Sequence, residues 1–369
     1  MCVLLLALGY ARLAPGARIE SARDYRIWSF GAFAYSDIIA LHGDRGGGRH
    51  RLPYLEDRIE YPVLLGIHMY WPSLLAPNRL GYFLLSYLAL SACALGTLWL
   101  LCGIEGTRPW AFAATPALTL YAGLNWDLFA IFPMMLGIRW WLSQRRLAGA
   151  AALAVGACTK VFPGLALGAL LVREAPRRAV LPAALALALA ALVNAPFAIL
   201  ARSNWRWFFE YNSGRDNEPT IYTLFGAGKR DAIALAGGLL AASVLVCLFV
   251  FAISRRNLRI RAAIAAVALV FFFFTRVWSP QYWLWILAVL ALAGAPLWVA
   301  AAASGAAVLD YVAAFGLLHL SVASDYAQAS WFYRELFLPN VAIRCALIGG
   351  AALWGLVRAI PSQREAPRV

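Results

Sequence analysis

Two charged residues, Lys160 and Asp37, are candidates for chemistry, and Lys160 lies where a charge is costly. Lys160 is near the middle of a long apolar block, residues 147–172, and Asp37 follows a short apolar segment at the N-terminus. A lysine far from both ends of such a block must face protein or water, and by default it marks a functional site. A carboxylate beside an embedded cavity is a candidate general base, because partial burial raises its pKa toward the working range. An ordinary loop aspartate or helix cap is the alternative interpretation of Asp37.

The two candidate cations suit a phosphate group. Lysine is a compact point charge, so Lys160 is a candidate phosphate ligand. Arg276 lies in the segment 275–282 between two apolar stretches, where its guanidinium can bind a phosphate bidentately. A charged helix end that extends to the membrane surface explains Arg276 equally well.

Besides Asp37, Lys160 and Arg276, further polar and aromatic residues are candidates for binding a sugar. The run from Asn204 to Asn212 interleaves aromatic side chains with polar ones, which suits a sugar ring but is also typical of an interfacial aromatic belt. The candidate substrate-binding residues are Tyr35, Glu60, Tyr61, Asn125, Asp127, Arg215, Asp216, Gln281, Tyr282 and His319.

The composition indicates a membrane protein. The 369 residues are 63% hydrophobic and 14% charged, with a net charge of +14. Soluble domains are roughly 45–50% apolar and about 25% charged, so a soluble enzyme and a disordered chain are excluded. The arginines cluster in short connectors between apolar segments, which is the pattern of cytoplasmic loops and not of a nucleic-acid-binding surface. The six cysteines show no metal or redox spacing and are expected to be small buried hydrophobes.

Long apolar stretches that recur along the whole chain predict a single all-α polytopic domain over residues 1–369, with about ten transmembrane helices. The first ten residues are too short to span, which favours an incomplete first span. The expected spans are 79–102, 109–124, 126–143, 179–200, 232–253, 262–276, 281–294, 296–318 and 340–358, together with the block 147–172.

Basic connectors set the expected orientation. The connectors 144–146, 173–178 and 255–261 and the tail 359–369 are placed in the cytoplasm. The block 147–172 then has both ends in the cytoplasm, which one straight helix cannot satisfy. Two half-helices that meet near Lys160 do satisfy it, and such a break requires a polar cavity or a protein cover. The connectors 11–62, 201–231 and 319–339 are expected on the outer side.

With these residues in view, the chain resembles a known family. It is similar to the bacterial, largely actinobacterial, integral-membrane glycosyltransferases of the GT-C fold, and within them to the polyprenyl-phosphate-mannose-dependent α-mannosyltransferases of glycosyltransferase family 87. The order and spacing match over roughly residues 30–300. The matching segments are 35–38 (YSDI), 53–54 (PY), 60–62 (EYP), 125–127 (NWD), 160–163 (KVFP), 194–196 (NAP), 207–209 (WFF) and 279–282 (SPQY).

The resemblance implies an inverting hexosyltransferase of the bacterial plasma membrane. Its donor is a polyprenyl-phosphate sugar, mannose by the resemblance, and its acceptor is a lipid or glycan on the extracytoplasmic face. The first-loop aspartate, Asp37 here, is implied as the general base. Lys160 and Arg276 can neutralise the donor phosphate, so neither a metal nor a cofactor is expected. The chain departs from the family in its short first span and in the single proline of the 60–63 segment.

Two other functions are compatible with a broken helix and a membrane-buried lysine. A transporter or flippase of lipid-linked sugars uses such features, although no internal repeat is visible in the two halves of the sequence. A non-catalytic membrane scaffold is the other, but it gives no reason to keep Lys160 and Arg276 near membrane depth.

Overall fold

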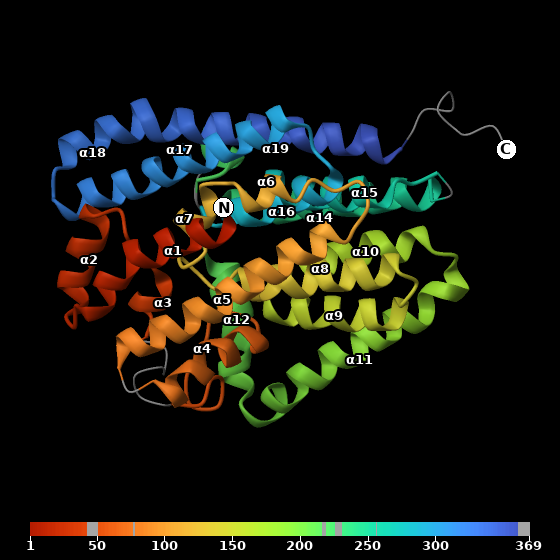
Figure 1. The fold of residues 1–369 in the computed structure, drawn as a ribbon, viewed down its shortest axis with the longest axis horizontal. Coiled ribbons are helices and arrows are strands. Elements are labelled where there is room, and N and C mark those ends of the chain that lie inside the picture. Colours follow the sequence, from red (N-terminus) through yellow and green to blue (C-terminus); the bar gives the residue numbers. More distant parts are fainter. Residues whose placement is uncertain (43–50, 77, 216–218, 226–230, 256, 361–369) are drawn as a thin grey trace.

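The computed structural model describes residues 1–42, 51–76, 78–215, 219–225, 231–255 and 257–360. Within these residues the only regular secondary structure is helical (Figure 1). The sequence-based expectation of an all-α chain is therefore confirmed for this part.

Five helices are long and apolar enough to cross a membrane, by length and composition, within the part of the chain described. They are α5 (Arg79–Cys102), α11 (Pro176–Leu200), α14 (Asp231–Ile253, apolar from Leu235), α17 (Leu297–Val322) and the continuous stretch Tyr326–Ala359. Six shorter apolar helices accompany them: α4 (Val63–Leu75), α8 (Leu128–Leu142), α9 (Arg146–Thr159), α10 (Pro163–Arg173), α15 (Ile260–Phe274) and α16 (Tyr282–Ala293). The chain thus has membrane-protein character, and the residues that the structure describes do not confirm the expected number of about ten transmembrane helices.

The block 147–172 breaks at Lys160, as the charge pattern predicts. Helix α9 ends at Thr159, Lys160 has an extended backbone, and Pro163 begins α10. At 1.5 Å per residue the two helices are about 21 Å and about 16 Å long, too short for a bilayer core of about 30 Å. The Nε of Arg146 at the start of α9 lies 2.9 Å from Oε1 of Glu174 just beyond α10, so the two outer ends meet.

Several connectors are more helical than expected. The 11–62 segment contains a 3-10 turn (Ala14–Arg18), α2 (Ala22–Gly31) and α3 (Asp37–Ala40), and it follows α1 (Cys2–Leu13). The 201–231 segment contains α12 (Arg202–Gly214) and α13 (Ile221–Leu224). The 319–339 connector is largely helical as well, with α18 (Tyr326–Phe332) and a π-turn (Tyr333–Phe337) that runs directly into α19 (Leu338–Ala359).

One expected span is divided. Residues 109–124 form two short helices, α6 (Trp110–Ala113) and α7 (Ala117–Tyr121), rather than one. Pro116 cannot donate a backbone hydrogen bond and disfavours a helical residue before it, which ends α6. After α7 the chain turns through Gly123 and reaches Asn125 and Asp127, the polar residues that precede α8.

The helices surround a large buried core, and a small second cluster lies between α17 and α19. The most deeply buried members of the large core come from α8, α15 and α16, and the indoles of Trp126, Trp283 and Trp285 are almost completely inaccessible. Helix α11 lies at the periphery of the bundle (Figure 1), and only 6% of its apolar window is buried. Of the six cysteines four are buried, Cys93 is partly exposed and Cys102 is exposed; all are unpaired.

Candidate functional site

Three segments that are distant in sequence meet at Asp37. This residue begins α3, and its backbone N–H donates a hydrogen bond to the carbonyl of Leu124, 2.8 Å away. The hydroxyl of Ser36 donates to the carbonyl of Gly123 at 2.6 Å. These bonds fix the start of α3 against the turn before α8, which carries Asn125.

The side chain of Asn125 connects the carboxylate to the lysine. Its Nδ2 donates to Oδ2 of Asp37 at 2.8 Å and to the hydroxyl of Tyr61 at 3.0 Å. Its Oδ1 accepts from Nζ of Lys160 at 3.1 Å. The side-chain amide of Asn125 thus uses both its N–H donors and its oxygen acceptor, which fixes the positions of Asp37, Tyr61 and Lys160 relative to one another.

Lys160 forms a buried ion pair on its other side. Its Nζ lies 2.9 Å from Oδ2 of Asp127, whose Oδ1 accepts from the indole of Trp285 at 2.7 Å. The relative exposure of Lys160 is 8% and that of Asp127 is 0%, so both charges are removed from water. Removing either partner leaves an uncompensated buried charge, which is strongly destabilising.

Asp37 itself has a perturbed acidity. Burial raises the pKa of its carboxyl above the ordinary value, and this effect outweighs the hydrogen bonds from Asn125 and Tyr35 and the charge of Lys160, which lower it. A carboxylate with a raised pKa is a stronger base, which suits proton abstraction near neutral pH.

A cavity of about 570 Å³ opens in front of this network. Eight of the thirteen predicted site residues line it, together with apolar side chains such as Phe208 and Phe271. The eight are Asp37, Glu60, Tyr61, Asn125, Lys160, Arg215, Gln281 and Tyr282. Six of the eight motif segments therefore contribute to this cavity, and the segments 53–54 and 194–196 instead line an adjoining apolar pocket.

The other predicted residues lie elsewhere. Tyr35 lies beside Asp37 and packs on Phe30, while Asp127 lies behind Lys160; neither lines the cavity. His319 is exposed on α17, next to Gly31 and away from the cavity. Asp216 lies outside the described residues.

Arg276 binds backbone instead of lining the cavity. Its Nη2 donates to the carbonyl of Asn212 at 2.6 Å and its Nη1 to the carbonyl of Arg215 at 3.1 Å. These carbonyls lie at the end of α12, where the last carbonyls of a helix have no intrahelical partner. In this structure Arg276 therefore fixes the end of the helix whose side chains form a cavity wall.

Helix α12 contributes three cavity residues that are not among the predicted site residues, Phe208, Tyr211 and Asn212, beside the predicted Arg215. The aromatic run 204–212 that contains them suits a sugar by its composition, but the expected structure of this segment is a loop. The spacing 208, 211, 212, 215 is one face of a helix, so helical periodicity in the aromatic run is the signal that identifies these residues.

A second buried network, also not predicted, fixes the segment that carries Gln281 and Tyr282. Asp310 on α17 pairs with Arg344 on α19 and accepts from the indoles of Trp278 at 2.8 Å and Trp283 at 3.2 Å. Asp310 is 1% exposed and Arg344 2%. The network anchors the 275–283 segment between the last two long helices.

An apolar pocket of about 220 Å³ adjoins the polar cavity. It shares wall residues with that cavity and continues between α4, α9, α11 and α12. The shared residues are Tyr61, Pro62, Val161 and Phe208. A ligand with a polar head and an apolar tail can therefore extend across both spaces.

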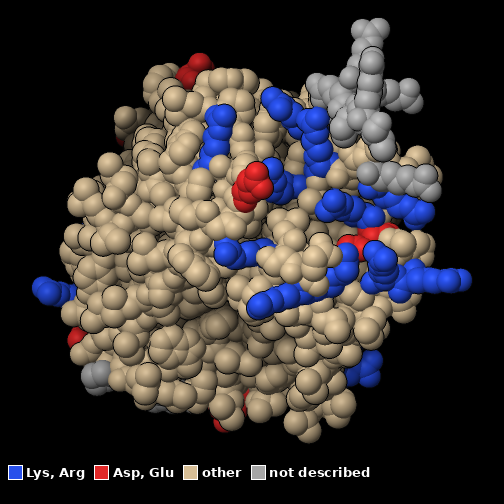
Figure 2. Space-filling model, turned by 45° about the vertical axis from the view of Figure 1, so that its right-hand side comes forward, with Lys and Arg blue, Asp and Glu red and all other residues tan. Residues whose placement is uncertain are grey.

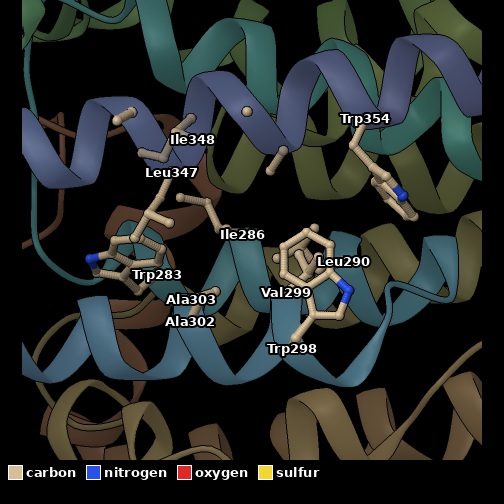
Figure 3. Close-up of a pocket in the computed structure, with 13 residues that line it drawn as sticks. Trp283, Ile286, Leu290, Trp298, Val299, Ala302, Ala303, Leu347, Ile348 and Trp354 are labelled. Carbon is tan, nitrogen blue, oxygen red and sulfur yellow. The ribbon is translucent and has the colours of Figure 1, made fainter.

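Another apolar pocket, of about 190 Å³, lies between α16, α17 and α19 (Figure 3). Aliphatic and tryptophan side chains line it, and it has no acid, base or nucleophile. Among the described residues, no group of three His, Cys, Asp or Glu side chains could hold a metal ion.

Comparison with known proteins gives no assignment. The chain matches no protein-family model and no curated protein sequence. The ordered motifs and the cavity to which six of them contribute therefore carry the functional argument.

Proposed function

We propose that this protein is a membrane glycosyltransferase that transfers a hexose from a polyprenyl-phosphate donor to a hydroxyl of a lipid or glycan acceptor. Mannose is the sugar that the motif resemblance favours. The observation that carries the proposal is the Asp37–Asn125–Lys160 network at the wall of a cavity that adjoins an apolar pocket.

Asp37 supports the chemistry as the base. In the proposed step, the acceptor hydroxyl gives its proton to the carboxylate of Asp37 while its oxygen forms a bond to the anomeric carbon of the donor. The bond between that carbon and the phosphate oxygen breaks, and polyprenyl phosphate leaves with the bonding electron pair. Attack opposite the leaving group inverts the anomeric carbon.

The leaving phosphate gains one negative charge in this step, so nearby cations stabilise the transition state more than the ground state. Arg215 lines the cavity, and Lys160 lies in its wall. Asn125 and Asp127 accept two of the three ammonium protons of Lys160, whose Nζ also lies 5.6 Å from the ring centroid of Tyr61. No other described residue accepts a hydrogen bond from this ammonium, which leaves one proton for the phosphate. Arg276 supports this arrangement by holding the end of α12, where Arg215 begins the next segment.

The adjoining apolar pocket supports a lipid donor. Its walls include Ala157, Val161, Trp205 and Phe209, and it borders the peripheral helix α11. A prenyl chain gains about 25 cal/mol for each Å² of apolar surface that it buries. The polar cavity then receives the sugar and phosphate while the tail extends toward the membrane.

The test is transfer of labelled mannose from polyprenyl-phosphate-mannose in membranes that contain the full chain. We expect Asp37→Asn, which keeps the shape of the side chain, to lower the transfer rate at least about a hundredfold, because general-base catalysis contributes about 10²–10⁴-fold. Asp24→Asn changes an exposed aspartate of the preceding helix and is the matched control. It should transfer mannose at the rate of the unchanged chain.

Equal rates for Asp37→Asn and the unchanged chain would remove Asp37 as the base. Donor flipping across sealed vesicles, with no transfer by any form of the chain, would overturn the proposal in favour of a lipid-sugar flippase. Protein levels are compared by immunoblot so that loss of folding is not taken for loss of chemistry.

A further inference from the structure

A second polar cavity, of about 580 Å³, lies at the opposite end of the bundle from α2 and α3. Three connecting regions form it: the loop after α5, the end of α8 and the start of α15. Its lining residues are Gly103, Ile104, Glu105, Gly106, Arg139, Leu142, Ser143 and Arg261. Lysine and arginine side chains gather on the face that this end presents (Figure 2).

Arg139 is held in a fixed orientation at this cavity. Its guanidinium lies 5.3 Å from the ring centroid of Trp99, and its Nη1 donates to the carbonyl of Leu100 at 3.3 Å. A Cβ on Gly103 would overlap the guanidinium, so the absence of a side chain there makes room for the arginine. Most of its five N–H groups are thus unused by the described residues around it.

Arg261 has weaker protein contacts still. It makes no hydrogen bond or ion pair with any other described residue, and its Nη1 is buried without an acceptor. Gly106 lies against this guanidinium with φ of +71°, a backbone conformation that favours glycine. A buried donor without a partner is costly, so an acceptor at this position is stabilising.

The charges around the cavity favour an anion. Two guanidiniums line it, against the single carboxylate of Glu105, whose residue is exposed. Arginine presents planar pairs of donors that match the oxygens of a phosphate. Both guanidiniums line the same cavity, and a phosphate offers more acceptor oxygens to such donors than a carboxylate does.

We propose that the cavity between Arg139 and Arg261 binds a phosphate group, as a site separate from the sugar-transfer cavity. The phosphate can belong to the headgroup of an anionic lipid or to a free phosphate compound. The inference does not depend on the proposed transferase activity, because it rests on different residues at the other end of the molecule.

The test measures thermal unfolding of the delipidated full chain in a neutral detergent. Three additions are compared at equal ionic strength: inorganic phosphate, short-chain phosphatidylglycerol and short-chain phosphatidylcholine. We expect phosphate or phosphatidylglycerol to raise the Tm of the unchanged chain, and Arg261→Gln to weaken the apparent affinity at least about tenfold. Arg145→Gln removes an exposed arginine of a neighbouring connector that does not line the cavity, and it should respond as the unchanged chain does.

The outcomes separate the sources. A response to inorganic phosphate assigns a free phosphate compound, and a response to phosphatidylglycerol alone assigns a lipid headgroup. No response to either, or equal responses from Arg261→Gln and Arg145→Gln, overturns the proposal. If Arg261→Gln does not fold, Arg261→Lys keeps the charge but not the paired donors and should still weaken binding; unchanged affinity in that variant overturns the proposal as well.

Discussion

Asn125 is one of three groups, with Tyr35 and Lys160, that lower the pKa of Asp37 against the larger effect of burial, which raises it. The Nδ2 of Asn125 stabilises the charged form of the carboxylate, which lowers a pKa that burial raises. The Oδ1 of the same side chain accepts a hydrogen bond from Lys160, so this neutral amide connects the lysine to the base.

Replacing Asn125 should therefore change the pH dependence of transfer. In Asn125→Ala the carboxylate of Asp37 loses the hydrogen bond from Nδ2 of Asn125. The pKa of Asp37 therefore rises further, and the base is protonated at a higher pH. We expect the acid limb of the kcat/KM profile to move to higher pH, with a smaller loss of rate above the limb. Asn257→Ala, at an exposed asparagine, is the control. An acid limb at the same pH in both variants would contradict this role.

Among the helices, the break between α9 and α10 follows from the charge pattern, whereas the segment that forms α12 was expected to be a loop although its spacing carries a helical signal. Lys160 with Pro163 inside an apolar block, flanked by basic connectors, can only be reconciled by a reversal of the chain. The segment 202–214 has no long apolar run, so only the spacing of its aromatic and polar residues along one face indicates a helix. Contacts from Arg276 and Asn212 stabilise α12, and these are tertiary.

The contact of Arg276 with α12 predicts a specific kinetic effect. Arg276→Met leaves two carbonyls at the helix end without a donor, which loosens the wall that carries Asn212 and Arg215. We expect KM for the donor to rise about tenfold, equivalent to about 1.4 kcal/mol, with a smaller fall in kcat.

Arg202→Met, at an exposed arginine at the start of the same helix, provides the comparison. Its KM should stay within about twofold of the unchanged value. A fall in kcat at constant KM for Arg276→Met would instead place the guanidinium on the transition state, as direct phosphate binding requires.

For the whole molecule, composition and charge predicted the class of fold and the grouping of the basic connectors. The backbone N–H of Arg259 donates to the carbonyl of Ala359, and Arg146 pairs with Glu174, so two pairs of these connectors, each distant in sequence, are in contact. The number of full-length spans was not predictable, because hydropathy does not distinguish a short buried helix such as α16 from one that faces lipid. The Asp310–Arg344 pair was equally hidden, since two charges far apart in sequence carry no mutual signal.

Cysteines at the two ends of the helix bundle should be labelled from opposite sides of the membrane. Cys102 is exposed at the end of α5 near the basic connectors, whereas Asp24 is exposed on α2 at the other end of the bundle (Figure 1). A membrane-impermeant maleimide should react with Cys102 only in inside-out vesicles. In a Cys102→Ser chain, Asp24→Cys should react only in right-side-out vesicles. Reaction of both positions from one side would overturn this orientation.

The reversal at Lys160 also affects how the chain's topology is counted. Because both ends of the α9–α10 pair lie at the same end of the bundle, the pair contributes no net crossing. A hydropathy count that takes 147–172 as one crossing therefore assigns the wrong side to every later connector, from α11 to the C-terminus. Alkaline phosphatase or fluorescent-protein fusions after Arg145 and after Arg173 should report the same compartment, although an apolar block of transmembrane length separates the two junctions.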